Sequence, residues 1–155
     1  MVQYQILIDD LSSESVRALL ELHLKGMMEN TPADNVFALD LTGLQQPEVT
    51  VWSGWDQPNL AGIGALKQLD DGLTGELKSM RTAPDYLRKG VGAALLECII
   101  SYATSLNFKR LSLETGSGSS FDPALSLYRK RGFINGYAFG DYTKSEFNQF
   151  LHLAL

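Results

Sequence analysis

The chain has 155 residues, a length that usually forms one domain and hides about 69 % of its surface on folding, enough for one hydrophobic core. Its single cysteine excludes a disulfide framework, and one cysteine with two histidines supplies too few ligands for a zinc site, so we expect no metal. The formal net charge of -5 argues against a broad nucleic-acid-binding surface and predicts no nucleic-acid partner.

The sequence also lacks the patterns of export and membrane insertion. Its first six residues have neither the basic flank nor the apolar stretch of a secretory signal, and no apolar run approaches the ~18 residues that a membrane span needs. We find no internal repeat and no linker that would divide the chain. These features predict a single domain over residues 1–155, a cytoplasmic location and no membrane partner.

The first 46 residues predict one strand, one long helix and a short helical region. Residues 3–9 are typical of a strand, and residues 12–15 offer a helix cap. In the helix that follows, apolar positions recur at the i, i+3, i+4 and i+7 spacing, which places them on one face: Val16, Leu19, Leu20, His23, Leu24 and Met27. Thr31 and Pro32 end this helix, and residues 33–46 are interpreted as a second, short helical region.

The rest of the chain predicts three consecutive strands and then alternating helices and strands. The three strands, at residues 48–55, 60–69 and 73–82, are joined by short turns, which favour an antiparallel meander. The later elements are a helix with its apolar face from Val91 to Tyr102, a strand at 110–114, a helix from Asp122 to near Gly132, and strands at 133–139 and 148–155. Because parallel strands joined through a helix need crossover connections, we expect an α/β fold, with a mixed, mostly antiparallel central sheet of about seven strands and helices on both faces.

The segment at residues 79–96 carries the clearest sign of a ligand site. A strand ends there, a short loop follows, and Gly90 and Gly92 stand at the start of a helix. Glycines let a ligand approach the backbone, and the unpaired N–H groups of residues 88–93 form an anion site with the positive end of the helix dipole. Arg88 and Lys89 add two positive charges suited to phosphates. The segment matches neither the Walker loop nor the Rossmann pattern, and a tight turn with solvated basic residues is the alternative.

Two motifs at the proper separation make the sequence similar to the GCN5-related N-acetyltransferase (GNAT) superfamily, and the order of elements fits along the whole chain. The acetyl-CoA loop of that family, Gln/Arg-x-x-Gly-x-Gly/Ala, corresponds to Leu87-Arg88-Lys89-Gly90-Val91-Gly92, and Pro84-Asp85-Tyr86 resembles its Pro-x-Tyr lead-in. The second motif, Ala-x-x-Leu-Tyr-x-x-x-Gly-Phe, corresponds to residues 124–133. Two positions depart from the pattern: Leu87 stands where a polar residue is usual, and Phe121 stands where an asparagine is frequent.

The resemblance implies a GNAT-type fold and acetyl-CoA as the acyl donor. It implies that the strands at 73–82 and 110–114 splay apart, and that the pantetheine arm lies between them and pairs with the backbone like a neighbouring strand. A backbone N–H of the first of these strands would stabilise the negative charge that develops on the acetyl oxygen. The residues that the resemblance assigns to cofactor binding are Met80, Arg81, Thr82, Leu87, Arg88, Lys89, Gly90, Val91, Gly92 and Ala93.

The resemblance also implies two catalytic residues. Tyr128 occupies the position that protonates the leaving thiolate, and its alternative is a core aromatic on an apolar helix face. Glu76 lies in mid-strand, where many relatives carry the carboxylate that takes the proton of the amine; a strand residue paired with Lys78 is the alternative. Glu114, at the end of the splayed strand, competes with Glu76 for the role of base. A bulge in the strand of Glu76 would change which face its side chains take.

Other polar and aromatic residues are assigned mainly to packing. His23 is predicted to be a core histidine with satisfied hydrogen bonds, Cys98 an inert packed thiol, and residues 115–120 a mobile connection rather than a phosphate cradle. Asp141 and Tyr142 are candidates for the wall of an acceptor pocket. The aromatic residues assigned to the core or to a cleft wall are Phe37, Trp52 and Trp55.

Together these features predict an acetyl-CoA-dependent N-acetyltransferase that acts on a primary amine of a small molecule or peptide by direct attack in a ternary complex. The alternatives are a non-catalytic CoA- or acyl-CoA-binding regulatory module and a nucleotide-binding α/β protein. The net charge of -5 mildly favours a cationic acceptor, whereas Arg81 equally favours an amino acid. The oligomeric state stays open, with a homodimer common among members of the family.

Overall fold

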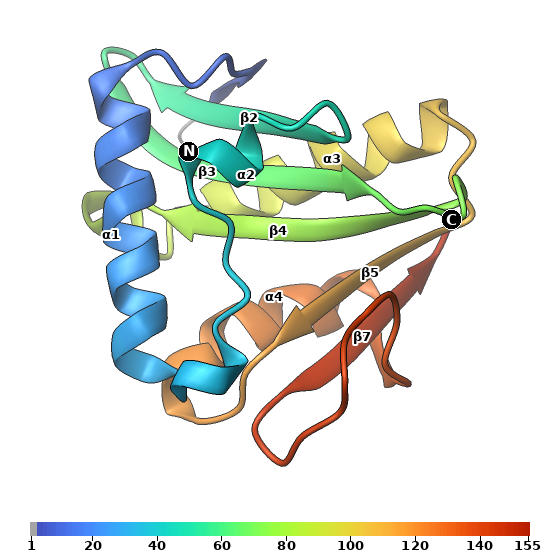
Figure 1. The fold of residues 1–155 in the computed structure, drawn as a ribbon. Helices are drawn as coiled ribbons and strands as arrows, with labels where there is room; N and C mark the ends of the chain where they lie inside the picture. The colour runs from blue at the N-terminus through green and yellow to red at the C-terminus, as the bar shows by residue number, and fades with distance from the viewer. Residues whose placement is uncertain (1–2) are drawn as a thin grey trace.

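The computed structural model describes residues 3–155, and within them it shows one seven-stranded sheet with helices on both faces (Figure 1). The strands are β1 (Gln5–Ile8), β2 (Val49–Asp56), β3 (Asn59–Gln68), β4 (Thr74–Thr82), β5 (Arg110–Thr115), β6 (Ile134–Gly136) and β7 (Gln149–Ala154). The helices are α1 (Glu14–Asn30), α2 (Leu41–Leu44), α3 (Val91–Ser105) and α4 (Asp122–Arg131), with 3₁₀ turns at Ala33–Asn35, Pro84–Tyr86 and Ser119–Phe121. The fold class predicted from the sequence is therefore confirmed.

The strands follow one another across the sheet in the order β1-β2-β3-β4-β5-β7-β6. Every neighbouring pair is antiparallel except β4 and β5, which are parallel. The tight turn between β3 and β4 is held by Asp71, whose carboxylate accepts hydrogen bonds from the amides of Leu73 (2.9 Å) and Thr74 (2.8 Å). A side chain that bonds to the backbone two or three residues on favours such a turn, and it fixes the hairpin that precedes the site.

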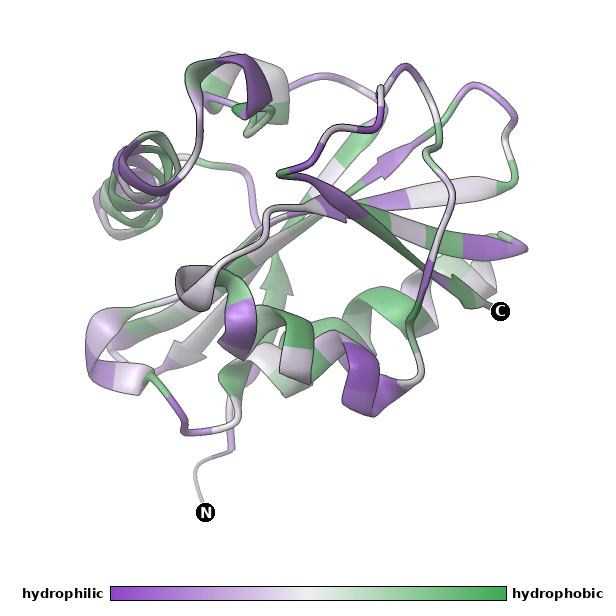
Figure 2. Cartoon of the chain, turned by 90° about the horizontal axis from the view of Figure 1, so that it is seen from below, coloured by the Kyte–Doolittle hydropathy of each residue, from purple (hydrophilic) through white to green (hydrophobic). Residues whose placement is uncertain are grey.

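A hydrophobic core lies on each face of the sheet. The core beneath α1 and α2 is made by Leu11, Val16, Leu19, Leu20, Leu44, Val51, Ile63 and Ala65. The larger core, on the opposite face, packs α3 and α4 against the strands (Figures 1 and 2). The side chain of Ser13 caps α1 by accepting a hydrogen bond from the Val16 amide at 3.2 Å, which confirms the predicted helix start. Between residues 3 and 155, no helix is long and apolar enough to cross a bilayer.

The two parallel strands separate halfway along their length. β4 and β5 pair only from Thr74 to Glu76 and from Arg110 to Ser112. Beyond this register β4 continues to Thr82, and in Figure 1 the two strands diverge toward the side where α1 lies. The expected splay is therefore present, and the edge of β4 that faces β5 has no strand partner after Glu76.

A bulge in β4 decides which way the side chains beside this opening point. Ser79 has a φ of 55°, and the register with β3 shifts at the same place. In a regular strand Lys78 and Met80 would face the same side. Instead Met80 packs over Gly64 on the α3 side, and the Arg81 guanidinium lies against Gly26 of α1. The sequence analysis considered a bulge in this strand; the structure contains one, and it turns Arg81 toward α1.

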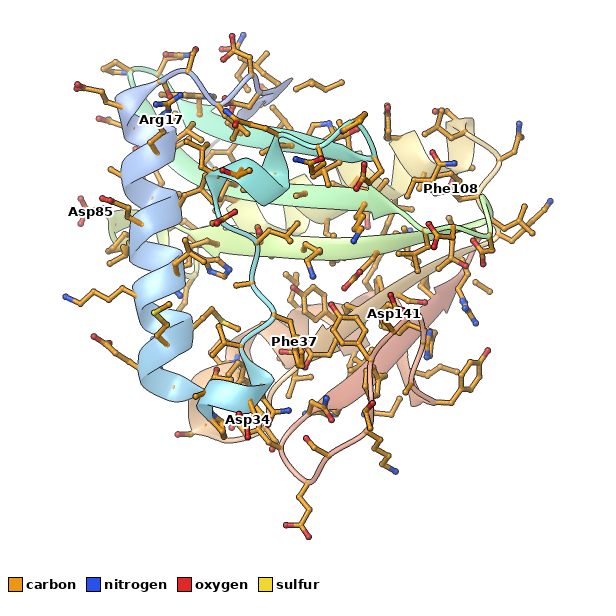
Figure 3. The ribbon with its side chains drawn as sticks, in the orientation of Figure 1. Arg17, Asp34, Phe37, Asp85, Phe108 and Asp141 are labelled. Carbon is orange, nitrogen blue, oxygen red and sulfur yellow. The ribbon has the colours of Figure 1, made fainter. Side chains whose placement is uncertain are left out.

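Two regions are less regular than the sequence predicts. The predicted strand at 133–139 is only Ile134–Gly136, because the chain then leaves the sheet and folds back over it, bringing the Phe139 ring 5.8 Å from the Phe150 ring. In the predicted helical region at 33–46 only the turn Ala33–Asn35 and the one-turn helix α2 form. The intervening residues are extended, and they carry Phe37 to the mouth of the opening between β4 and β5 (Figure 3).

Candidate active site

A cavity of about 170 Å³ lies where β4 and β5 separate. Residues from α1, β4, β5 and α4 line it, and among them are several that the sequence singles out: His23, Phe37, Glu76, Met80, Arg81, Glu114 and Tyr128. A more open cleft of about 750 Å³ adjoins it and shares Phe37, Glu76 and Lys78 as a common wall. Asp141 and Tyr142 line this second cleft, and Figure 3 shows Phe37 and Asp141 on the same face of the sheet.

The loop before α3 leaves the N-terminus of that helix open. Gly90 is the N-cap residue, with a φ of 87° that favours glycine, and no atom lies within 4 Å of a Cβ placed on it. The first amides of a helix have no acceptor within the helix, so those of α3 point into this open space. The sequence analysis predicts that the Lys89 amide is unpaired. This prediction is wrong, because the amide donates to the Tyr86 carbonyl at 3.3 Å.

Neighbouring side chains hold this loop in place. The Tyr4 hydroxyl donates a hydrogen bond to the Lys89 carbonyl at 2.7 Å, and the Lys89 ammonium lies 5.6 Å from the centre of the Tyr86 ring. The side chains of Leu87, Arg88 and Lys89 are exposed. A Cβ on Gly92 would come within 3.2 Å of Leu127 in α4, so the glycine permits the close approach of α3 and α4. The basic side chains are therefore at the rim of the open helix end.

Tyr128 lies on the side of α4 that faces the cavity. Its side chain is buried, and its ring packs at 5.7 Å from that of Phe133. Burial raises the pKa of the phenol well above its usual range, because the charged form is poorly solvated there. The hydroxyl therefore stays protonated at physiological pH.

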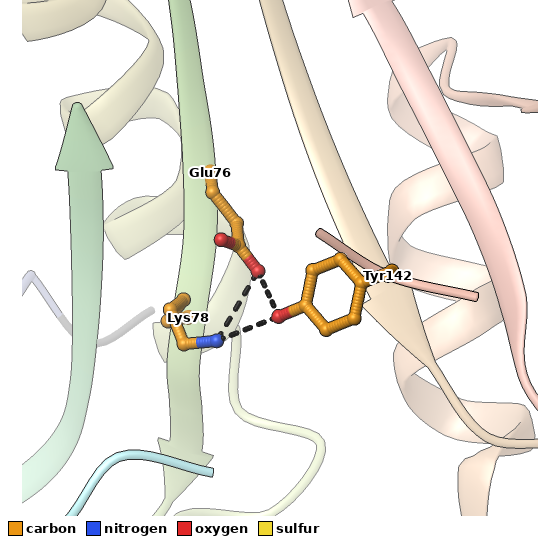
Figure 4. Close-up of polar contacts among 3 residues, drawn as sticks. All are labelled: Glu76, Lys78 and Tyr142. Atoms are coloured by element: carbon orange, nitrogen blue, oxygen red, sulfur yellow. Dashed lines mark hydrogen bonds and ion pairs between the residues drawn. The ribbon is translucent and has the colours of Figure 1, made fainter. Parts of the chain in front are cut away.

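Glu76, Lys78 and Tyr142 form a hydrogen-bonded cluster on the wall between the two cavities (Figure 4). The Lys78 ammonium donates to Glu76 Oε2 at 3.1 Å and to the Tyr142 hydroxyl at 2.9 Å, and that hydroxyl donates to the same Oε2. Glu76 is only 4 % exposed. Burial and the Glu76 carboxylate raise the pKa of Tyr142 far above its usual range, so its phenol remains a donor. Lys78 and Tyr142 thus both donate to one oxygen, Oε2, of the buried Glu76 carboxylate.

Glu114 is the second carboxylate of the cavity. The pKa of Glu114 is raised to about 7; burial is the largest cause and the nearby Glu76 carboxylate adds to it, while Lys78 and the side chain of Asn148 lower it. Both protonation states of Glu114 are consequently populated near neutral pH. This is the range in which a carboxylate exchanges protons with an amine most effectively.

His23 and Arg81 occupy the corner of the cavity next to α1. His23 is 7 % exposed and its Nδ1 has no hydrogen-bond partner among residues 3–155, so the prediction of a satisfied core histidine is wrong. Burial lowers the pKa of His23 to about 4, with a further contribution from the positive charge of Arg81, and the ring is therefore neutral. The side chain of Arg81 points toward α1, whereas its backbone pairs with Ile63 of β3.

Three other sequence-based assignments are clarified by the packing. Trp52 lies in the core beneath α3, and Trp55 packs at the edge of the other core. Cys98 is partly buried on α3, and burial raises the pKa of its thiol, which suits an unreactive side chain. Within residues 3–155 no cluster of three or more His, Cys, Asp or Glu residues is placed to hold a metal.

The sequence analysis missed the joint role of Lys78 and Tyr142. The sequence analysis gave a pair of Glu76 with Lys78, two residues on in the strand, as the alternative to a base, and the structure shows this pair at 3.1 Å. No local pattern links Tyr142 to Glu76, because the contact depends on the loop after β6 folding back over the sheet. Ser79 was also overlooked: it forms the bulge, and its Oγ has no hydrogen-bond partner among the described residues.

Comparison with known proteins agrees with this geometry. The model of the Acetyltransferase (GNAT) family matches residues 10–133. The chain is 46 % identical over 152 residues to "Uncharacterized N-acetyltransferase YedL" of Escherichia coli (strain K12), covering 98 % of this chain and 95 % of that protein. It is 47 % identical over 137 residues to "Uncharacterized N-acetyltransferase YsnE" of Bacillus subtilis (strain 168), covering 88 % and 90 % of the two proteins.

A solved structure shows the same fold. The crystal structure of a Bacillus subtilis acetyltransferase in complex with CoA superposes with a TM-score of 0.71 at 19 % identity, with 99 % of each chain covered. Because the family model spans most of the chain and two relatives align over nearly all of it, the chain belongs to the GNAT family of acetyltransferases.

Proposed function

We propose that this protein transfers the acetyl group of acetyl-CoA to a primary amine of a small molecule or peptide, by direct attack of the amine in a ternary complex. The observation that carries this proposal is the cavity between β4 and β5. It brings a buried phenol, Tyr128, together with two carboxylates, Glu76 and Glu114, beside an unpaired strand edge. A proton donor and a proton acceptor at one opening are what acetyl transfer to an amine requires.

The residues present fit acetyl-CoA, which supplies the activated acetyl group. The open N-terminus of α3 offers amides to the diphosphate, from Gly90 to Ala93 and in the preceding Leu87 and Arg88, with the side chains of Arg88 and Lys89 at its rim. Met80, Arg81 and Thr82 lie in the part of β4 whose edge toward β5 is unpaired, and the backbone groups of Met80 and Thr82 are suited to pair with the amides of the pantetheine arm. Val91 lies at the start of the helix, where its amide is free to donate.

Tyr128 serves the leaving group in this proposal. Its phenol is protonated because it is buried, and it can donate a hydrogen bond to the sulfur as negative charge develops there. The ring packs against Phe133, which holds the hydroxyl in one position toward the cavity. A fixed donor stabilises the charge that develops on sulfur without having to reorient during the reaction.

The two carboxylates divide the work that the sequence analysis gives to Glu76 alone. Lys78 and Tyr142 hold Glu76 through one oxygen, Oε2, so its other oxygen can accept a hydrogen bond from the ammonium form of the acceptor. Glu114, with a pKa of about 7, accepts the proton that the amine must lose before it attacks. Glu76 thus contributes charge and position, and Glu114 contributes the titrating base.

The second candidate function is a CoA-binding module without acetyl transfer. It is favoured by the two departures from the family pattern, Leu87 and Phe121. Leu87 is apolar although it is 59 % exposed, and Phe121 is buried against Phe147. Neither side chain can offer the coenzyme a polar contact. The expected homodimer and cytoplasmic location stay predictions.

Thiol release from acetyl-CoA across a panel of amines separates the two functions. Release that depends on the amine supports the transferase if the product is heavier than the amine by one acetyl group, about 42 Da. Calorimetry with CoA alone provides the control. Tight binding of CoA with no release for any amine would favour the regulatory module, and failure to bind CoA while adenine nucleotides bind would favour the nucleotide-binding alternative.

A further inference from the structure

The corner of the cavity beside α1 carries polar groups that the proposed chemistry does not use. We propose that this corner binds a carboxylate of the acceptor, so that the substrates are small amines that also carry a carboxylate group. The inference rests on the proposed function, because it names the class of acceptor for the same site. The residues proposed to bind the carboxylate are Arg81, His23 and Ser79.

Arg81 has no acidic partner among the residues that the structure describes. Two ion pairs form among residues 3–155, Glu76 with Lys78 and Glu97 with Arg131, and Arg81 belongs to neither. It lines the cavity and is only partly exposed. A guanidinium presents a planar set of donors that matches a carboxylate in two parallel hydrogen bonds. A partly buried, unpaired guanidinium at a cavity wall is therefore suited to an anionic group from outside the protein.

Gly26 makes room for this guanidinium. Glycine inside a helix costs about 0.5–1 kcal/mol relative to alanine, so its presence in α1 calls for a reason. A Cβ at this position would lie 3.1 Å from Nη2 and 3.4 Å from Nη1 of Arg81. The absence of a side chain lets the guanidinium lie flat against the helix. This arrangement places the Arg81 guanidinium against α1 at the wall of the cavity, which Gly26 also lines.

Two buried polar atoms beside Arg81 also lack partners. His23 is only 7 % exposed, and its Nδ1 makes no hydrogen bond to any described residue. Ser79 Oγ is likewise buried and unbonded among residues 3–155. A buried polar atom without a partner costs about 1–3 kcal/mol, and a bound ligand that supplies the partner recovers that cost. The neutral imidazole and the hydroxyl are both able to donate to a carboxylate oxygen.

The charges in the cavity are distributed to suit a molecule with two opposite ends. Glu76 and Glu114 offer negative charge toward an ammonium, and Arg81 offers positive charge toward a carboxylate. A cavity of about 170 Å³ leaves room for a small molecule. This volume and the two opposite charges favour a small amino acid over a long polyamine.

The test compares amino acids with their amides, which keep the primary amine and replace the carboxylate by an uncharged group. The probes are glycine, leucine, phenylalanine, β-alanine and γ-aminobutyrate, each with its carboxamide. For the wild-type protein we expect kcat/KM for the best acid to exceed that of its amide by about tenfold or more, as for a charged hydrogen-bonded pair. In Arg81→Gln this acid-to-amide ratio falls by about tenfold or more, and in Arg81→Lys it falls less.

A matched variant controls for loss of positive charge in general. Lys25→Gln removes one charge from the exposed side of the same region, outside the cavity, and should leave the acid-to-amide ratio unchanged. His23→Leu should lower the ratio by several-fold, because it removes one proposed donor and keeps an apolar side chain. The ratio is insensitive to partial loss of folded protein, since both substrates report on the same sample.

Binding measurements keep this inference separate from the proposed function. Calorimetry with the CoA-bound protein and the same ten probes requires no acetyl transfer. Binding of acids that is lost in Arg81→Gln supports the carboxylate site even if no thiol is released, and in that case only the proposed function fails. The inference would be overturned if acids and amides were acetylated with equal efficiency, or if no acid bound. It would also be overturned if Arg81→Gln affected acids and amides equally, or changed the KM for acetyl-CoA.

Discussion

The phenol of Tyr142 donates a hydrogen bond to the carboxylate of Glu76, although the two residues are 66 positions apart in the chain. The contact joins the loop after β6 to the middle of β4, directly on the wall of the cavity. Phe37 packs edge-on against the same tyrosine at 5.1 Å. Three separate segments therefore meet at the carboxylate that is proposed to receive the amine.

A double-mutant cycle should reveal the strength of the Tyr142–Glu76 contact. Tyr142→Phe leaves the buried carboxylate with one donor fewer, and we expect the free energy of unfolding to fall by about 1–3 kcal/mol. In the double variant with Glu76→Gln, the loss of unfolding free energy should differ from the sum of the two single losses by about 0.5–3 kcal/mol. Urea unfolding gives these values. Tyr102→Phe, whose ring packs on Trp52 away from the cavity, is the control, and strict additivity in the cycle would contradict the contact.

Replacement of Tyr128 tests the proposed acid. Tyr128→Phe removes the hydroxyl and keeps the ring that packs on Phe133, so the fold should be retained. We expect turnover to fall by about 10²-fold or more, as for loss of a general acid, while the affinity for acetyl-CoA changes only a few-fold. Steady-state kinetics and calorimetry measure the two effects. Tyr102→Phe again serves as the matched control, and wild-type turnover in Tyr128→Phe would remove this assignment.

A negative charge at the start of α3 should prevent coenzyme binding. Gly90→Asp places a carboxylate at the open helix end and a side chain at a φ of 87°, so both repulsion and the loss of space oppose the diphosphate. We expect CoA binding to become undetectable by calorimetry. Gly72→Asp is the control: it makes the same substitution at a glycine with a φ of 68°, in the turn before β4 and away from this loop. This variant should bind CoA normally. Retained binding in Gly90→Asp would place the diphosphate elsewhere.

The pH dependence of kcat/KM should identify the base. A carboxylate accepts protons only when ionised, so activity should rise with pH and reach half of its plateau near the Glu114 pKa of about 7. Glu114→Gln should remove this limb. Glu76→Gln should keep the limb and move its midpoint to lower pH, because the negative neighbour that raises the Glu114 pKa is gone. The reverse pattern, with the limb lost in Glu76→Gln and shifted in Glu114→Gln, would make Glu76 the base.

Local sequence patterns determined the order of elements and the position of the coenzyme loop. Caps, turns and apolar periodicity depend on residues close together in the chain, as in the Ser13 cap and the Asp71 turn, and each of these was found where the sequence predicts it. The loop motif at residues 87–92 likewise lies between a strand and a helix. The splay of β4 and β5 was predicted through the family resemblance and is present in the structure.

Only the tertiary structure decided what surrounds each side chain in the cavity. The bulge at Ser79 reverses the faces of Met80 and Arg81, and a single extra residue of this kind has no reliable local signature. The state of Glu114 depends on burial and on the charges of Glu76 and Lys78, which come from another strand. Burial and the distances between charged groups are properties of the packed molecule, so the sequence named the chemical groups of this site and the fold determined how they act on one another.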